Sequence, residues 1–207
     1  MISGKIIASG AEANIVLSND KVIKDRIEKG YRLKEIDSKI RILRTRQETK
    51  LLEKASKIIN APKPEEQKDK KSTKIVMPEI KGKKLSEYLD KLPEKKALEI
   101  CQKIGQSIAK LHDSNIIHGD LTTSNIILDK NNEVWFIDFG LGFHSERIED
   151  KAVDLHLIKQ ALEAKHFEDW EEYFKAIMKG YKISKNDSQV VERLKVVESR
   201  GRYKEKI

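Results

Sequence analysis

The hydrophobic residues follow two different periods along the chain, and the first part of the sequence begins with strand-like runs. Residues 2–8 and 13–24 are rich in β-favouring side chains, and the pair Asn19-Asp20 between two such runs indicates a hairpin turn. Over residues 34–59 apolar side chains recur at steps of three and four, which predicts one long helix. A proline shortly afterwards prevents that helix from continuing.

The remaining pattern is strand-like in short pieces and otherwise helical. The polar stretch 62–74 and the apolar run 75–77 are interpreted as two strands joined by a charged turn. Apolar residues at steps of three and four then predict a core-facing helix over residues 94–113. Short strands are predicted at 116–117, 126–128 and 134–137, and further helices from about residues 154 and 167.

These elements predict an α+β protein with a minimal bilobal architecture. Residues 1–81 are expected to form a small lobe of one sheet and one helix, and residues 82–207 a larger, mostly helical lobe. A chain of 207 residues can bury about 70% of its unfolded surface, so it needs no disulfide for stability. The single cysteine, Cys101, falls on the apolar face of a predicted helix and is expected to be buried and inert.

The composition favours a protein of the cytoplasm. One thiol cannot crosslink its own chain, which agrees with a reducing compartment. No apolar run approaches the roughly 20 residues that a membrane span needs. Lys5, Gly10 and Glu12 interrupt the N-terminal segment, which therefore lacks the apolar core of a signal peptide. We expect a cytoplasmic protein with no membrane association.

The charge balance leaves two interpretations open. The chain has 42 Lys and Arg against 34 Asp and Glu, a net charge of +8. This balance describes either a solvated surface of mixed charge or a protein with an anionic partner, nucleotide or nucleic acid. The last fifteen residues carry six basic side chains and two acidic ones, so part of the excess positive charge lies at the C-terminal end.

Candidate chemistry is concentrated in residues 118–125, His-Gly-Asp-Leu-Thr-Thr-Ser-Asn, and in Asp138-Phe139-Gly140. Each polar residue alone would commonly be a turn former or a loop cap. Together, with predicted strands on either side, they form a set suited to phosphoryl transfer, which asks a protein mainly for positioning and charge neutralisation. A loop aspartate can orient or deprotonate a hydroxyl or water, and an asparagine and a second aspartate can hold Mg²⁺ against phosphates.

This arrangement resembles the catalytic loop and the metal-binding motif of the protein-kinase superfamily. The resemblance implies an enzyme that uses ATP and Mg²⁺, with Asp120 acting on the nucleophile and with Asn125 and Asp138 as metal ligands.

The resemblance extends to the predicted strand that ends in Lys24, which matches the kinase strand whose lysine reaches the nucleotide phosphates. A lysine at the end of a strand is commonly just exposed, so this position alone is weak. Its helix partner should be a glutamate. Glu48 lies at the border of the apolar stripe and is chosen over Glu35 and Glu53, because that location directs its carboxylate inward.

The nucleotide-binding loop and the hinge follow from the same resemblance. The loop residues are Ala8, Ser9, Gly10, Ala11, Glu12 and Ala13, and they contain one glycine where kinases have G-x-G-x-x-G. Glu12 would bring a negative charge towards the phosphates, so either Glu12 turns away or the nucleotide sits differently. The hinge is expected from Met77 to Ile80, where backbone groups of Glu79 and Ile80 would meet the adenine edge; a purely structural role is the alternative.

Three departures from ordinary protein kinases narrow the resemblance. Gly119 stands where an arginine normally precedes the catalytic aspartate, and Thr122 stands where many kinases have a lysine. Only thirteen residues separate Gly140 from Asp154, so the activation loop and its peptide platform are nearly absent. With the segments GAEAN, RTRQE, HGDLTTSN and RGR, the chain resembles, over nearly its whole length, the small atypical kinase subunit of the KEOPS complex.

That family implies ATP hydrolysis in support of threonylcarbamoyl modification of a tRNA adenosine beside the anticodon, together with serine and threonine (auto)phosphorylation. It also implies the threonylcarbamoyl transferase subunit, other KEOPS subunits and tRNA as partners. Arg200, Arg202 and Lys204 are expected to contact tRNA or a partner, and a disordered, solubilising terminus is the alternative. Two other functions stay open: a small-molecule phosphotransferase of the aminoglycoside or choline kinase type, and a non-catalytic tRNA-binding pseudokinase scaffold.

Overall fold

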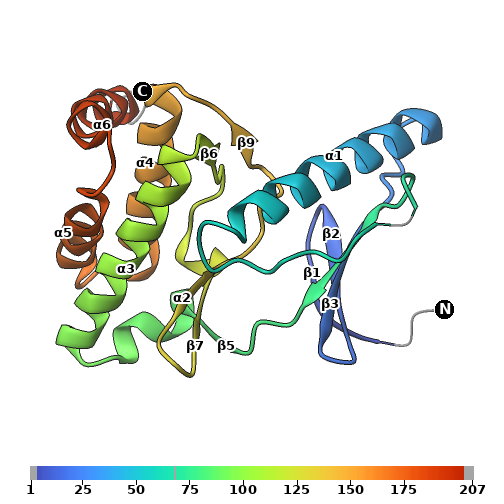
Figure 1. Ribbon diagram of the computed structural model, residues 1–207, viewed down its shortest axis with the longest axis horizontal. Coiled ribbons are helices and arrows are strands. Elements are labelled where there is room, and N and C mark those ends of the chain that lie inside the picture. Colours follow the sequence, from blue (N-terminus) through green and yellow to red (C-terminus); the bar gives the residue numbers. More distant parts are fainter. Residues whose placement is uncertain (1–3, 68, 203–207) are drawn as a thin grey trace.

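The computed structural model describes residues 4–67 and 69–202, with side chains as far as Arg200. Figure 1 shows a sheet with one long helix in the first part of the chain and a mostly helical second part. This arrangement is the α+β architecture that the sequence predicts.

A four-stranded antiparallel sheet with strand order β1-β2-β3-β4 forms the smaller lobe. Asn19 and Asp20 have φ values of 49° and 57°, which Asn and Asp tolerate better than most residues, and they make the predicted tight turn between β2 and β3. The strands are β1 (Lys5–Ser9), β2 (Ala13–Ser18), β3 (Lys21–Arg26) and β4 (Lys74–Pro78).

One helix, α1 (Lys34–Ala55), accompanies this sheet. It ends four residues before the predicted boundary, because residues 56–60 continue as turns. Only the C-terminal half of its apolar pattern is in the core: Leu51 and Leu52 are buried, whereas Leu43 is 62% exposed. The N-terminal half of α1 extends away from the larger lobe (Figure 1), which explains why its apolar side chains find no core to enter.

The second strand predicted within residues 62–74 is absent from the described part of that segment. The Glu65 amide donates to the Val76 carbonyl at 2.8 Å, so the chain does run beside β4. Pro62 and Pro64 have no N–H to donate, and a continuous ladder therefore cannot form.

The larger lobe begins with a second sheet of strand order β5-β7-β8. Its strands are β5 (Gly82–Lys84), β7 (Ile126–Asp129) and β8 (Val134–Phe136). A two-stranded sheet pairs β6 (Ile116–Ile117) with β9 (Phe143–His144). Because β4 belongs to the first sheet and β5 to the second, the residues between them connect the two parts; the lobe boundary at residues 81 and 82 stays a prediction.

Helices make up the rest of this lobe around α3 (Glu94–Asp113), which begins and ends where the sequence predicts. Cys101 is fully buried on α3, as expected, and burial raises the pKa of its thiol to about 12. Gly105 lets α3 approach the backbone of Ile177, since any Cβ would overlap that carbonyl. The other helices are α2 (Leu85–Tyr88), η1 (Leu89–Lys91), η2 (Thr123–Asn125), α4 (Ile148–Lys165), α5 (Trp170–Tyr181) and α6 (Asp187–Arg202).

The start of α4 lies six residues before the prediction at residue 154, and α5 starts three residues after the prediction at 167. Residues 148–153 have no clear apolar period, which is why the pattern missed them. Instead, Ser145 bonds Asp150 at 2.6 Å, and Glu149 and Asp150 lie in the first helical turn, where negative charge is favourable. None of the helices in residues 4–67 and 69–202 combines the length and apolarity that crossing a membrane requires.

Candidate active site

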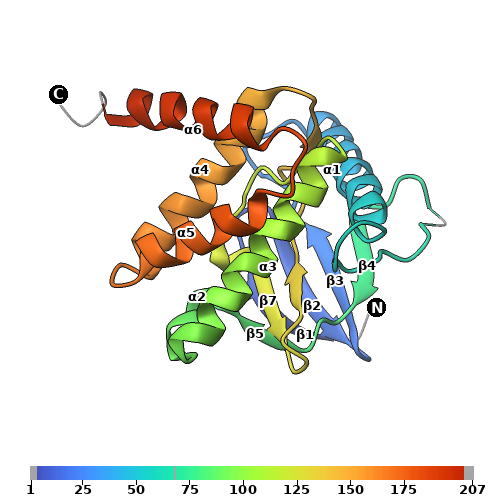
Figure 2. The ribbon, with the colours of Figure 1, turned by 60° about the vertical axis from the view of Figure 1, so that its left-hand side comes forward.

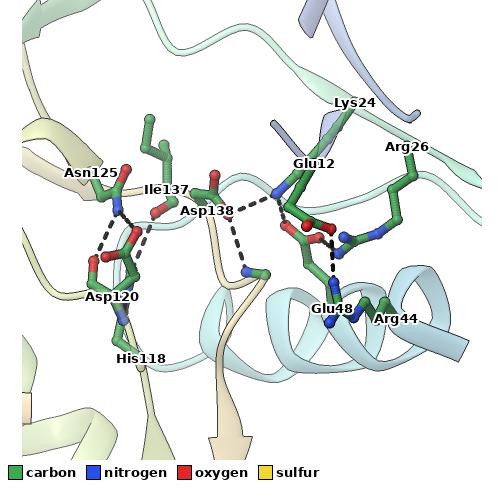
Figure 3. Close-up of polar contacts among 11 residues, drawn as sticks. Glu12, Lys24, Arg26, Arg44, Glu48, His118, Asp120, Asn125, Ile137 and Asp138 are labelled. Atoms are coloured by element: carbon green, nitrogen blue, oxygen red, sulfur yellow. Dashed lines mark hydrogen bonds and ion pairs between the residues drawn. The ribbon is translucent and has the colours of Figure 1, made fainter. Parts of the chain in front are cut away.

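The catalytic loop holds Asp120 by contacts within the loop itself (Figure 3). The Asn125 Nδ2 donates to both the backbone carbonyl and the Oδ2 of Asp120, at 2.9 Å in each case. The short helix η2 supplies the turn that brings residues five apart face to face. Both amide hydrogens of Asn125 are directed at Asp120, so its Oδ1 remains as an acceptor.

A buried carboxylate from α4 fixes the backbone before Asp120. Asp154 Oδ2 accepts from the amide of His118 at 2.8 Å, and Oδ1 accepts from the amide of Gly119 at 2.9 Å. Burial alone would raise the pKa of Asp154, but hydrogen bonds and charge from His112 and His118 outweigh it and hold the pKa below its ordinary value of 3.8.

The role of Asp154 was missed in the sequence. The available signal was a lone acidic residue between Ala152 and Leu155, both fully buried on the same helix. An acid on an apolar helix face needs a partner, and here the partners are backbone amides of the catalytic loop.

Asp138 is placed beside the catalytic loop through the residue that precedes it. The Ile137 amide donates to the Asn125 carbonyl at 2.9 Å, and the His118 Nε2 donates to the Ile137 carbonyl at 3.2 Å. Asp138 itself has φ of +63°, a left-handed conformation that few residues with a Cβ adopt and that Asp tolerates better than most, and such conformations are common at functional sites. Phe139 is fully buried with its ring 4.6 Å from that of His118, which anchors the tripeptide in the core.

Lys24 bridges the two lobes (Figure 3). Its Nζ lies 2.7 Å from Glu48 Oε1 and 2.7 Å from Asp138 Oδ1, so the predicted ion pair with Glu48 is confirmed. Burial alone would raise the pKa of Asp138, but the charge and hydrogen bond of Lys24, with the Gly140 amide, lower it below 3.8. Asp138 is therefore ionised at neutral pH, as a ligand of a cation must be.

Arg26 is a second partner of Glu48 that the sequence interpretation overlooked. Its guanidinium lies 2.6 Å from Glu48 Oε2, and Glu48 is 1% exposed. Lys24 and Arg26 are two residues apart in β3 and therefore share a face of the strand, a spacing that could have revealed the pair. One buried carboxylate thus serves two buried cations.

Gly119 is required by the path of the segment that follows Gly140. It has φ of +77°, and a Cβ there would overlap the carbonyl of Leu141. The segment continues into β9, pairs with β6, and is tied to α1 by a hydrogen bond of 3.0 Å from Gln47 Nε2 to the Gly142 carbonyl. The short activation segment therefore rests directly on the catalytic loop and on α1.

The loop predicted to bind the nucleotide is a tight connection between β1 and β2. The Gly10 amide donates to the Ala13 carbonyl at 3.0 Å, and the Ala11 carbonyl accepts from Lys29 Nζ. Glu12 is turned to α1, where its carboxylate lies 2.7 Å from Arg44 (Figure 3), so a cation at the surface of the same lobe balances its charge. Ala8 and Ser9 lie in β1 and are exposed.

The residues expected at the hinge lie in different environments, one in the core and two at a cavity. Met77 is 9% exposed and belongs to the core. The Glu79 amide donates to the Asp20 carbonyl at 2.9 Å, so this amide is unavailable to an adenine edge; contact through the other backbone groups of Glu79 and Ile80 stays a prediction. Glu79 and Ile80 also line a cavity of about 380 Å³ with Trp135, a residue of β8 outside the catalytic set.

The donor set fits a magnesium ion held jointly with phosphates. Asn125 keeps an amide oxygen and Asp138 a carboxylate, both hard oxygen ligands. Within the described residues, no group of three or more His, Cys, Asp or Glu side chains could hold a metal by itself. Mg²⁺ is commonly held by one or two protein ligands plus substrate phosphates, which is the arrangement these two residues could provide.

The C-terminal basic residues lie on a helix as far as the structure describes them. Arg193 and Arg200 both approach Glu149 of α4, at 3.3 and 2.7 Å. The alternative of a disordered terminus is therefore wrong for residues 193–202. The side chain of Arg202 and the whole of Lys204 lie outside the described residues.

Comparisons with known proteins agree with this geometry. The family model described as protein kinase domain matches residues 7–180. The chain is 42% identical to "KEOPS complex subunit Bud32" of Pyrococcus abyssi, over 98% of this chain and 97% of that protein. It is 36% identical to "Probable serine/threonine-protein kinase BUD32 homolog" of Archaeoglobus fulgidus, over 96% of each.

A third relative is longer than this chain. The match to "Probable bifunctional tRNA threonylcarbamoyladenosine biosynthesis protein" of Methanobrevibacter smithii is 43% identical and covers 96% of this chain but 36% of that protein. The chain therefore corresponds to about a third of this relative.

Proposed function

The chain belongs to the protein kinase family, and within it to the family of the KEOPS complex subunit Bud32, and from this membership we propose that it is the ATP-dependent atypical kinase and ATPase of a KEOPS complex. In that setting its ATP turnover supports threonylcarbamoyl modification of a tRNA adenosine. The observation that carries the proposal is the position of Lys24, bonded at 2.7 Å to both Glu48 and Asp138. This contact joins three distant segments into one charged site.

Each residue of the site has a proposed task. Lys24 neutralises nucleotide phosphates, and Glu48 keeps the flexible lysine aimed at them. Asp120 orients or deprotonates the attacking hydroxyl or water, and Asn125 holds its carboxylate in position. Phosphoryl transfer depends mainly on positioning and electrostatic stabilisation, which such a set supplies.

ATP is the proposed substrate and Mg²⁺ the proposed cofactor. Asn125 and Asp138 would hold the ion, and Mg²⁺ when bound neutralises charge on the phosphate oxygens. Residues 8–13 would cover the phosphates, with Gly10 giving the backbone room to approach them. The balance of the Glu12 charge by Arg44 removes the objection that this loop would repel a nucleotide.

The proposed activity differs from that of a regulated protein kinase. Gly119 cannot be replaced by the usual arginine in this conformation, and residues 141–147 lead directly from Gly140 to α4. An activation segment of this kind offers little surface for laying out a peptide and needs no phosphate to order it. ATP hydrolysis, with serine and threonine phosphorylation including its own, is therefore the activity we propose.

The proposed partners are inferred from the names of the relatives. We propose the threonylcarbamoyl transferase subunit, other KEOPS subunits and tRNA as partners, in the cytoplasm. Arg200, Arg202 and Lys204 are proposed to contact tRNA or a partner. In the conformation described here Arg200 is paired with Glu149, and that pair would have to open.

Substitution of the two catalytic aspartates tests the proposal. Asp120→Ala is expected to lower ATP turnover by roughly 10²–10⁴-fold while ATP binding stays largely intact, because Asp120 acts on the nucleophile. Asp138→Ala is expected to weaken Mg·ATP binding, because it removes a metal ligand. Turnover is measured with and without tRNA and the transferase partner, and nucleotide binding by calorimetry. Equal loss of nucleotide affinity in both variants would contradict this division of roles.

A further inference from the structure

The outer face of α3 carries two adjoining hollows that lie outside the active site. The first, of about 450 Å³, is lined by residues 56–60 after α1, by α3, and by Glu133 and Val134 at the start of β8. The second, of about 500 Å³, is lined by residues 93–103 and by Asn131 and Asn132. Figure 2 shows α3 at the front with the end of α1 and the β7 hairpin beside it. Lys103 lines both hollows, and we call the two together the lysine groove.

The lysine groove has an excess of positive charge. Its charged residues are Lys57, Lys95, Lys96, Lys103 and Lys110 against Glu99 and Glu133. Only Lys103 is neutralised, by Glu133 at 2.7 Å. Among the described residues no carboxylate lies within 4.0 Å of the other four ammonium groups. Four lysines of the groove therefore have no ion-pair partner among the described residues, and with Glu99 and Glu133 counted against the five lysines the groove has a net charge of +3.

The spacing of the lysines suits a long anionic partner. Lys96, Lys103 and Lys110 are seven residues apart on α3, so they follow one side of the helix at intervals of about 10.5 Å and span about 21 Å. One strand of a nucleic acid carries a phosphate every 3.4 Å or so along its axis, and this stripe could contact several phosphates of one strand. A single small anion would need its cations gathered around one point.

The rest of the lining favours RNA over an acidic peptide. Asn60, Gln106, Ser107, Asn131 and Asn132 offer hydrogen-bonding groups along the rim. Of the apolar residues that contribute, Ile59, Ile100 and Val134 are buried, whereas Ile58 is partly buried and Pro93 is exposed. The groove therefore offers few accessible apolar residues with which a protein surface could anchor peptide side chains. Lysine ammonium groups act as point charges towards phosphate.

We infer that the lysine groove binds the phosphate backbone of an RNA strand without reading its sequence. The choice of tRNA as the RNA rests on the function proposed above. No residue of the groove belongs to the catalytic set of Lys24, Glu48, Asp120, Asn125 and Asp138. RNA bound there would hold the protein on its substrate without occupying the nucleotide site.

The test measures tRNA binding to the full-length protein over a range of salt concentrations, with no ATP present. The groove variant carries Lys57→Ala, Lys96→Ala and Lys110→Ala. If each lysine contacts one phosphate, the slope of log Kobs against log salt should fall by about 2 to 3, at 0.7–0.9 per contact. A matched variant with Lys165→Ala, Lys179→Ala and Lys182→Ala removes the same charge from exposed positions outside the groove. Its slope should stay nearly unchanged, because distant charges are screened.

Three further measurements make the outcome decisive. Basal ATP turnover of the groove variant should equal that of the parent protein, so failure of the proposed enzyme activity is seen separately from failure of RNA binding. Acetylation of the unsubstituted protein should be slowed by tRNA at the groove lysines and not at the control lysines, which tests the site even if the variant folds poorly. Poly-glutamate is the second probe and represents an acidic polypeptide in place of RNA. The inference would be overturned by equal salt slopes for both variants or by acetylation of the groove lysines that tRNA does not slow. It would also be overturned if the groove variant lost binding of poly-glutamate but kept binding of tRNA.

Discussion

The buried carboxylate of Glu48 gives a sharp test of how the smaller lobe is held together. The perturbation is Glu48→Gln, which keeps the shape of the side chain and removes its charge. In the parent protein Glu48 is 1% exposed and contacts Lys24 at 2.7 Å and Arg26 at 2.6 Å. Lys24 keeps Asp138 as a second partner, whereas Glu48 is the one ion-pair partner of Arg26 among the described residues. The substitution therefore leaves the buried guanidinium of Arg26 without a counter-charge.

The magnitude follows from burial. Removing one partner of a buried ion pair typically costs about 3–5 kcal/mol, because the remaining charge has lost both water and its counter-ion. For a chain of this size about 1 kcal/mol corresponds to roughly 2–4 °C in Tm, so a decrease of about 6–20 °C is expected. Glu12→Gln is the matched control, since Glu12 and Arg44 are 50% and 41% exposed. An exposed pair of this kind contributes about 0–1 kcal/mol.

Urea unfolding and thermal unfolding of the three proteins measure the difference, with refolding checked so that the free energy of unfolding is defined. Adding Arg26→Met to Glu48→Gln should recover part of the lost stability, because it removes the stranded charge. If Glu48→Gln costs no more than Glu12→Gln, or if Arg26→Met brings no recovery, the account of Glu48 as the shared partner of two buried cations is wrong.

Two further predictions concern the catalytic loop. Gly119→Ala is expected to lower the free energy of unfolding by several kcal/mol, because φ is +77° and the new Cβ would overlap the Leu141 carbonyl; Gly30→Ala, where a Cβ meets nothing within 4 Å, should be nearly neutral in the same urea experiment. Asp154 has a pKa below 3.8 when folded, so it stabilises the fold above that pH and loses this contribution as the pH falls through the folded pKa. Asp154→Asn should therefore be most destabilising at pH 7 and progressively less so below pH 3.8, and a pH-independent difference would refute the linkage.

Local patterns in the sequence were sufficient for much of the fold. The bounds of α3 agree with its apolar period because one face of this helix is in the core along its whole length. The turn at Asn19 and Asp20 was predictable because its conformation depends on those residues themselves. By contrast, α4 begins in a polar segment, where Ser145 bonds Asp150 and where Glu149 pairs with Arg193 and Arg200 of the distant helix α6.

The candidate site shows the same division between features that local sequence predicts and features that only tertiary contacts fix. The sequence by itself was sufficient to select Asp120, Asn125 and Asp138 as the candidate catalytic residues, because they are close in the chain and their spacing is constrained by a short loop and hairpin. Only the tertiary structure decided what holds them: Asp154 under the catalytic loop, Arg26 beside Glu48, and the Leu141 carbonyl over Gly119. Those contacts join segments far apart or pair a side chain with a backbone atom. Such contacts leave no periodic pattern in the sequence, because the partners are chosen by the packing of helices and strands.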